Sequence, residues 1–321
     1  MARKRKGIPI SGWLAIDKPL GLSSAQVVGK VRWLLKAAKV GHGGTLDPLA
    51  TGVLPIALGE ATKTVSYVMD GTKTYRFQVR WGEATATDDR EGEITGTSPA
   101  RPTIEAIEAA LPAFTGEIEQ IPPAYSAIKV DGERAYDLAR AGETVELKSR
   151  LVRIERFSLL AQPDADHADF EVVCGKGTYI RSLARDLARA LGTVGHVSVL
   201  RRTACGPFRE ENAISLETLE QVGQGPAPWS FLLPVETALD DIPALALTEV
   251  EARRLQNGGP VSVLHVAARH PEASFKSGTI CRAMMGPRLV ALARIESGAI
   301  HPVRVMNLTS HEQGVDDVDH A

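Results

Sequence analysis

The strongest constraint on the fold of this chain is a strict alternation of apolar and polar residues from Thr74 to Trp81. Successive side chains of a β-strand point to opposite faces, so a period of two predicts a strand with one buried face. That face would carry Tyr75, Phe77, Val79 and Trp81, and the other face would carry Thr74, Arg76, Gln78 and Arg80. The segment therefore predicts a sheet that covers a hydrophobic core.

Other periodic segments predict both strands and helices around it. Strand patterns occupy residues 11–17, 151–160, 168–174 and 196–200. Helical patterns run from Ser23 or Ser24 to about Lys39, over 103–111, and over 180–191, where Gly192 ends the last helix. In that helix Arg181 and Arg185 share one face, and the buried face consists of Ile180, Leu183, Leu187 and Leu191.

The pattern changes beyond about Ala238. The proline-bearing stretch 223–234 is typical of a domain connection, and a capping box, Thr248-x-x-Glu251, opens a helix that Gly258 can end. Strand candidates follow at 261–266, 279–285, 289–295 and 303–306. We predict a basic tail (1–10), a main domain (11–238), a mostly β C-terminal module (239–309) and an acidic tail (310–321).

Composition excludes several classes of protein. With 44% hydrophobic and 24% charged residues in 321, the chain is typical of a soluble protein of two domains. It has no apolar run of membrane-spanning length and no signal-peptide pattern, so we expect a cytoplasmic protein. Three scattered cysteines, Cys174, Cys205 and Cys281, fit neither a disulfide framework nor a zinc site. The spacing of a phosphate loop is also missing, which disfavours a nucleotide cofactor.

The net charge of −2 conceals two basic clusters. Residues 1–40 carry nine basic side chains against one acid, and residues 176–209 carry seven against one. Such clusters indicate either a surface that binds a polyanion or a set of solvated helix faces. The sequence leaves both interpretations open.

Three features carry candidate chemistry. The segment GHGGTLDPLATGVLPIALGEATK (41–63) contains Asp47, which is either an ordinary turn residue or a nucleophilic carboxylate that needs a cationic partner. Arg181 is either that partner or an arginine that binds phosphate or solvent. Tyr75 is either a core residue or a platform on which a base stacks.

Six blocks of the chain resemble the bacterial tRNA pseudouridine synthases of the TruB type, which isomerise the T-loop uridine at tRNA position 55. The resemblance runs from Gly12 to about Asn307 and includes the 41–63 segment. The other blocks are DKPLGLSS (17–24), KTYRFQVRWG (73–82), PPAYSAIKVDGERAYDLARAG (122–142), KGTYIRSLARDLARALG (176–192) and HVSVLRRTACGPF (196–208).

This resemblance implies a fold and a set of partners. The fold is mixed α/β (α+β), with a central, mainly antiparallel sheet, an insertion at about 120–150 that closes over RNA, and a PUA-like RNA-binding module at 239–309. The implied partner is the T-arm stem-loop of tRNA, with no membrane and no obligate protein partner. Such an isomerisation involves no redox change, hydrolysis or group donor, so no cofactor or metal is expected.

The resemblance also implies roles for individual residues. Asp47 is the catalytic carboxylate, Arg181 pairs with it, and Tyr75 stacks on the uracil and helps to remove its C5 proton. Tyr179 and Leu200 line the uracil pocket. Asp47 would attack C1′, act as a base that forms a glycal, or attack the uracil ring, and the sequence leaves these routes open.

Two further expectations concern RNA contact. The resemblance implies that His42 fills the space that the extruded nucleotide leaves in the T-loop. The two basic clusters would line the RNA cleft, with Arg202 outside the uracil pocket. Lys18 and Pro19 would shape the site without taking part in the chemistry.

Two other functions are compatible with such a cleft. One is a catalytically idle RNA-binding protein, which the presence of Asp47, Tyr75 and Arg181 disfavours. The other is an enzyme that works only with a guide RNA inside a larger particle. Activity of the purified protein on a bare T-arm stem-loop distinguishes both from an independent synthase.

Overall fold

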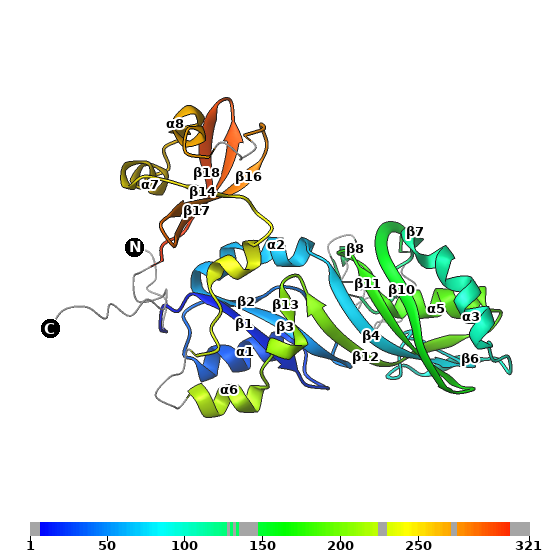
Figure 1. The fold of residues 1–321 in the computed structure, drawn as a ribbon. Helices are drawn as coiled ribbons and strands as arrows, with labels where there is room; N and C mark the ends of the chain where they lie inside the picture. The colour runs from blue at the N-terminus through cyan, green and yellow to red at the C-terminus, as the bar shows by residue number, and fades with distance from the viewer. Residues whose placement is uncertain are drawn as a thin grey trace.

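The computed structural model describes residues 7–126, 129–130, 133–134, 147–223, 230–270 and 275–308. Its centre is a nine-stranded sheet in the order β1-β3-β12-β4-β11-β10-β7, with β2 beside β3 and β13 beside β12 (Figure 1). These strands are β1 (Gly12–Lys18), β2 (Val40–His42), β3 (Ala50–Leu58), β4 (Lys73–Trp81), β7 (Gly116–Gln120), β10 (Arg150–Asp164), β11 (His167–Cys174), β12 (Gly195–Cys205) and β13 (Phe208–Arg209). Only the β3–β12 pairing within this sheet is parallel, which confirms the predicted mixed fold on a mainly antiparallel sheet.

Helices and short hairpins surround this sheet. The helices are α1 (Ser24–Leu34), α2 (Val65–Asp70), α3 (Ile104–Ala110), α5 (Ile180–Ala190) and α6 (Leu216–Gly223), with 3-10 turns η1 (Gly59–Lys63), η2 (Leu111–Phe114), η3 (Glu210–Asn212) and η4 (Val235–Leu239). The hairpins pair β5 (Glu83–Thr85) with β6 (Ile94–Thr97) and β8 (Lys129–Val130) with β9 (Glu133–Arg134).

Most predicted elements are present, but several boundaries were wrong, and the strand predicted at 151–160 extends to Asp164. Ser23 caps α1 in a capping box with Gln26, yet the helix ends at Leu34 rather than near Lys39. Lys36 has a left-handed backbone (φ 49°), which turns the chain so that β2 can pair with β3. Strand β12 runs on to Cys205, beyond the predicted end at residue 200, because it lies between two pairing strands, β3 and β4.

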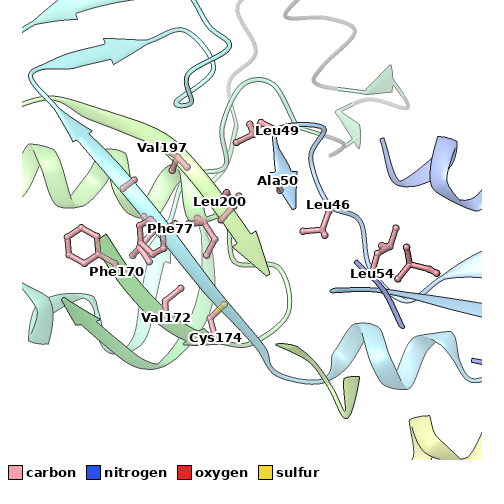
Figure 2. Packing of buried hydrophobic residues seen from close by; sticks show 14 of the residues in the cluster. Leu46, Leu49, Ala50, Leu54, Phe77, Phe170, Val172, Cys174, Val197 and Leu200 are labelled. Atoms are coloured by element: carbon pink, nitrogen blue, oxygen red, sulfur yellow. The ribbon is translucent and has the colours of Figure 1, made fainter. Parts of the chain in front are cut away.

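Strand β3 is almost entirely apolar, apart from Thr51, and both of its faces are buried. Leu54 and Ile56 point into one hydrophobic core, while Val53 and Ala57 point into a second core on the other side of the sheet. The first core also contains Leu14 and Phe77 and is partly shown in Figure 2. Because both of its faces are packed, β3 has a fixed position, and it is the strand that follows Asp47 along the chain.

The C-terminal module contains a separate five-stranded sheet in the order β14-β16-β17-β18-β15. Its elements are β14 (Ala244–Ala246), α7 (Glu249–Gln256), β15 (Val261–Ser262), α8 (Val263–Ala267), β16 (Ile280–Met285), β17 (Arg288–Glu296) and β18 (Ala299–Val305). The capping box of Thr248 and Glu251 is present. The strand predicted at 261–266 was wrong, since all but its first two residues are helical. Short apolar runs fit a strand and a helix equally well.

This module is packed firmly against the central sheet. Leu289, Leu292 and Met306 of the module share the second core with Trp13 and Phe208. Figure 1 shows the module over the end of the sheet that contains β1 and β2, far from β7.

Polar contacts at the same place connect η1 to the module. The Glu60 carboxylate accepts hydrogen bonds from Lys63 Nζ and the Asn307 amide, both at 2.6 Å, and Lys63 Nζ also donates to the Val305 carbonyl at 2.7 Å. Packing is continuous across the predicted boundary at 238/239, because Ala238 and Leu239 both belong to the second core. Both tails, except residues 7–10, and most of the 120–150 insertion lie outside the described residues.

Candidate active site

A cavity of about 580 Å³ opens where α5, β4, β10 and β12 meet the loop between β2 and β3. We call residues 43–49 of that connection the Asp47 loop. The cavity is lined by Asp47, Tyr75, Tyr179, Arg181 and Leu200, among others. Five of the six predicted site residues, contributed by separate segments of the chain, therefore meet in one place.

The Asp47 loop is fixed on both sides of Asp47. Before it, the Ser24 hydroxyl accepts a hydrogen bond from the Leu46 amide (2.8 Å) and donates one to the Leu46 carbonyl (3.0 Å). After it, the Pro48 carbonyl accepts hydrogen bonds from the Gly21 amide (2.9 Å) and from Lys18 Nζ (3.2 Å). The backbone at Asp47 therefore has little freedom, which is what a positioned catalytic group requires.

Asp47 forms an ion pair with Arg181. Its Oδ2 lies 3.0 Å from Nη2 of Arg181, and its side chain keeps 35% of its surface exposed to the cavity, whereas Arg181 keeps 5%. A buried guanidinium next to a partly open carboxylate leaves one face of the carboxylate free to react. This is the pairing that the resemblance implied.

A second carboxylate, Asp89, lies on the other side of Arg181, and the sequence analysis missed it. Asp89 Oδ2 is 3.4 Å from Nη1 of Arg181, and both groups are buried. Arg181 also donates to the carbonyls of Thr87 (2.9 Å) and Tyr125 (3.0 Å). Asp89 stands in a polar, turn-rich segment without periodicity, so no local signal indicated its contact with α5.

Tyr75 lies half-buried on β4 at the cavity, packed against the first core. Burial raises the pKa of its phenol to about 12, and the charge of Arg202 and a hydrogen bond from it oppose this rise. The hydroxyl therefore stays protonated at neutral pH. Tyr75 therefore packs against the core as one predicted alternative has it, and also lines the cavity, while its role as a stacking platform stays a prediction.

Tyr179 and Leu200 form other parts of the wall. The Tyr179 backbone is held by the side chain of Gln120, which accepts from its amide (2.7 Å) and donates to its carbonyl (3.1 Å). The guanidinium of Arg150 lies over the Tyr179 ring, 4.7 Å from its centroid. Leu200 is buried on β12 beside Phe77 of β4 and Ala50 of β3.

His42 does not line the cavity. It ends β2, half-buried, with Nδ1 accepting a hydrogen bond from the Gly44 amide at 3.4 Å. Burial, and secondly the charge of Arg202, lower the pKa of its ring. A neutral imidazole next to the Asp47 loop suits contact with a nucleotide base, and its predicted role in the T-loop stays a prediction.

The prediction that Arg202 lies outside the pocket was wrong. Arg202 is 1% exposed, lines the cavity, and donates to backbone carbonyls of the Asp47 loop. Leu200 and Arg202, two residues apart on one strand, share a face, and this period of two was the signal that would have placed Arg202 correctly.

The basic cluster at 176–209 offers less free charge than its composition indicated. Besides Arg181 and Arg202, Arg185 pairs with Asp88 and Asp186, and Arg201 pairs with Asp17 and Glu210. In the other cluster, Lys18 is fully buried. These side chains stabilise the fold or the site, so they leave fewer cations at the surface for a polyanion.

Within the ranges that the structure describes, no group of three or more His, Cys, Asp or Glu side chains could hold a metal ion. In the same ranges, no helix is long and apolar enough to cross a membrane.

Solved structures share this fold over almost the whole chain. A chain of a Cbf5-Nop10-Gar1 complex matches with a TM-score of 0.71 and 26% identity, covering 95% of this chain and 91% of that one. A chain of an H/ACA RNP bound to a substrate RNA containing 2'-deoxyuridine matches with a TM-score of 0.70 and 25% identity, with the same coverage. The fold is therefore shared with proteins that were solved as parts of larger complexes, one of them bound to RNA.

Sequence comparisons identify the family. Residues 32–180 match the N-terminal domain of the TruB family pseudouridylate synthases, and residues 181–240 match the tRNA pseudouridylate synthase B C-terminal domain. The tRNA pseudouridine synthase B of Rhodospirillum rubrum is 59% identical over 308 residues, and that of Caulobacter vibrioides is 56% identical over 310. Each alignment covers 96% of this chain and 100% of the relative. The chain belongs to the TruB family of pseudouridylate synthases, which are isomerases.

Proposed function

We propose that this protein converts the T-loop uridine at position 55 of tRNA to pseudouridine, with Asp47 as the catalytic carboxylate. The observation that carries the proposal is the carboxylate of Asp47, anchored by its neighbours on both sides and paired with a buried arginine at the wall of a cavity. The names of the relatives, tRNA pseudouridine synthase B, support tRNA as the substrate class.

The reaction rearranges one nucleotide without adding or removing atoms. The N1–C1′ bond breaks, the uracil turns, a C5–C1′ bond forms, C5 loses its proton and N1 gains one. A carboxylate can assist by attacking C1′, by taking a proton from the sugar to form a glycal, or by attacking the ring. Each of these routes needs one free carboxylate face directed at the nucleotide.

The surrounding residues would hold the reacting base. Tyr75 would stack on the uracil and assist the loss of the C5 proton, while Tyr179 and Leu200 close the pocket. Arg181 would orient Asp47. His42, just outside the cavity, would contact the loop that the nucleotide leaves. Extruding a base costs a few kcal/mol, and less for a base in a loop that is already poorly stacked.

The test is a single-turnover assay of the purified protein with a bare T-arm stem-loop. The protein should form pseudouridine without guide RNA or partner. Asp47→Asn should abolish turnover while the dissociation constant changes less than about tenfold, because the substitution removes a charge but little volume. Asp70→Asn is the matched control, since Asp70 is another carboxylate at the cavity, exposed and paired with Lys176.

Three results would count against the proposal. Turnover by the Asp47→Asn protein, with deamidation excluded by mass spectrometry, would remove Asp47 from the mechanism. An inactive wild-type protein that needs a guide RNA would indicate an enzyme of a ribonucleoprotein particle. Pseudouridine mapping in cells that lack this protein should show loss at position 55, and its persistence there would refute the substrate.

A further inference from the structure

Arg202 is one of the largest fully buried side chains of the protein, and it lies beneath the cavity. In the sheet it stands opposite Tyr75 of β4 and opposite Gly52 of β3. Directly opposed residues on neighbouring strands project to the same face, so Arg202 and Tyr75 are side-by-side neighbours. Gly52 has no side chain to compete for this space.

The guanidinium of Arg202 donates hydrogen bonds to three backbone carbonyls. Nε donates to Val53 (2.8 Å), Nη2 to Gly44 (3.1 Å) and Nη1 to Thr45 (3.3 Å). Two of these carbonyls belong to the Asp47 loop, only two or three residues before Asp47. The rigid fork of the guanidinium therefore connects that loop to the start of β3.

The charge of Arg202 is not matched by the carboxylates of the site. Asp47 and Asp89 pair with Arg181 instead. Burying a cation against neutral carbonyls is unfavourable compared with leaving it in water. A neutral side chain could satisfy some of the same carbonyls, so the retention of a full charge at this place indicates a use for it.

The effect of that charge extends around the floor of the cavity. Burial lowers the pKa of His42 and of Lys73, and the charge of Arg202 adds to both decreases. The same charge opposes the rise in the pKa of Tyr75 that burial causes. One buried cation therefore acts on the backbone that carries the carboxylate and on the aromatic residue that faces it.

We propose that Arg202 is a positioning residue for the isomerisation, which fixes the Asp47 loop through its carbonyls and holds the Tyr75 hydroxyl in place. The proposal depends on the roles proposed above for Asp47 and Tyr75. Because Arg202 acts from beneath the pocket, its loss should slow the chemical step and leave RNA binding nearly unchanged.

The test compares Arg202→Gln and Arg202→Lys with Arg201→Gln. Arg201 is the adjacent arginine on the opposite face, paired with Asp17 and Glu210 and outside the cavity lining. At saturating T-arm stem-loop, Arg202→Gln should lower the single-turnover rate roughly 100-fold or more, with a dissociation constant within about threefold. Arg202→Lys should recover part of the rate, since it keeps the charge but not the fork. Arg201→Gln should keep the wild-type rate.

Two further measurements separate positioning from general damage to the fold. In a cycle with Tyr75→Phe, the rate losses should be less than multiplicative, because both changes act on the same hydroxyl. By NMR, the pKa of His42 should rise toward its ordinary value in Arg202→Gln and stay unchanged in Arg201→Gln. If Arg202→Gln does not fold, the same measurements on Arg202→Lys test the proposal. The rate of Arg202→Lys should then lie below the wild-type rate, by less than the loss expected for Arg202→Gln.

A wild-type rate for Arg202→Gln, or multiplicative losses in the cycle, would overturn this inference while Asp47 keeps its role. An inactive wild-type protein on the T-arm would instead refute the proposed function.

Discussion

Arg181 and Arg202 are both buried at the cavity, but they have different kinds of partners. Arg181 lies between the carboxylates of Asp47 and Asp89, so its charge is compensated within the site. Arg202 instead donates to three backbone carbonyls and neighbours the neutral Tyr75 phenol, so its charge acts on the residues around it. At the scale of single residues, one arginine therefore contacts the Asp47 carboxylate itself, and the other contacts the backbone that carries it.

Tyr75 provides a direct test of a single hydroxyl. Its phenol stays protonated at neutral pH, so Tyr75→Phe keeps the ring proposed to stack on the uracil and removes only the hydroxyl proposed to assist proton transfer. We expect near-normal binding of the T-arm and a chemical step slowed roughly 100-fold, as for the loss of a general acid or base. Single-turnover kinetics measure both quantities.

Tyr67→Phe is the matched control for this experiment. Burial also raises the pKa of Tyr67, but its ring packs against the second core, away from the cavity. It should retain the wild-type rate. If Tyr75→Phe also retained that rate, the Tyr75 hydroxyl would have no part in the reaction.

The lowered pKa of Lys18 predicts that the stability of the protein depends on pH. Its burial lowers its pKa from 10.5 to about 8 in the folded protein, and its ammonium donates to the carbonyls of Pro19, Leu22 and Pro48. Between pH 8 and 10.5 the unfolded chain holds this proton more than the folded chain does. The contribution of Lys18 to the free energy of unfolding therefore rises with pH across that window.

We therefore expect the free energy of unfolding of the wild type, relative to that of Lys18→Met, to increase with pH. Between pH 7 and 10.5 the wild type should gain on the order of 3 kcal/mol of unfolding free energy relative to the variant, since each pKa unit corresponds to about 1.4 kcal/mol. Urea denaturation at a series of pH values measures it. A difference that stays constant over this range would show that the pKa of Lys18 is the same in both states.

At the scale of elements, the parallel contact of β12 with β3 determines how the site is assembled. It places Leu200 and Arg202 beneath the Asp47 loop and sends Arg201 to the other face. Gly52 makes this contact possible, because a Cβ there would lie 2.2 Å from the Arg202 carbonyl oxygen, and its φ of +97° also favours glycine.

Gly52→Ala should therefore disturb both stability and activity. We expect a loss of roughly 2–4 kcal/mol in the free energy of unfolding, because the added methyl group would force β3 and β12 apart. The single-turnover rate should fall as well, since this contact positions residues of the cavity. Gly192→Ala is the control, since Gly192 also has a positive φ (+73°) but open space around it, and should lose only about 1 kcal/mol. Equal losses for the two variants would contradict the importance of the contact.

At the scale of the whole molecule, the C-terminal module is part of the folded core. From the sequence, truncation after Ala238 is expected to cost RNA affinity more than chemistry, and also to destabilise the core if the module covers apolar surface. The structure places the module residues Leu289 and Leu292 in one core with Trp13 and Val53 of the central sheet. Truncation would expose this face to water.

A chain that ends at Ala238 should therefore be less stable as well as weaker in binding. Exposing several large apolar side chains costs about 1.5–3 kcal/mol each, so we expect the melting temperature to fall by roughly 10 °C or more. Thermal denaturation and gel filtration measure the loss and any aggregation. Glu60→Gln, which weakens the polar contacts to Lys63 and Asn307 without removing the module, should cause a much smaller decrease. A truncated chain that melts like the full chain would contradict this view.

The local periodicity and caps of the sequence were enough to predict β4, α5 and the start of α1. The cluster of Asp47, Tyr75 and Arg181 was implied by the resemblance to a known family. Each of these depends on neighbours within a few residues, or on a resemblance carried by short motifs. The sequence did not predict that Asp89 completes the pairing of Arg181 or that the module shares a core with β1. Arg202 was placed wrongly although its period of two with Leu200 indicated the shared face. Its carbonyl partners could not be predicted, because they are 149 to 158 residues away along the chain. Contacts of that kind depend on the order and register of strands in the folded sheet, which no local pattern encodes.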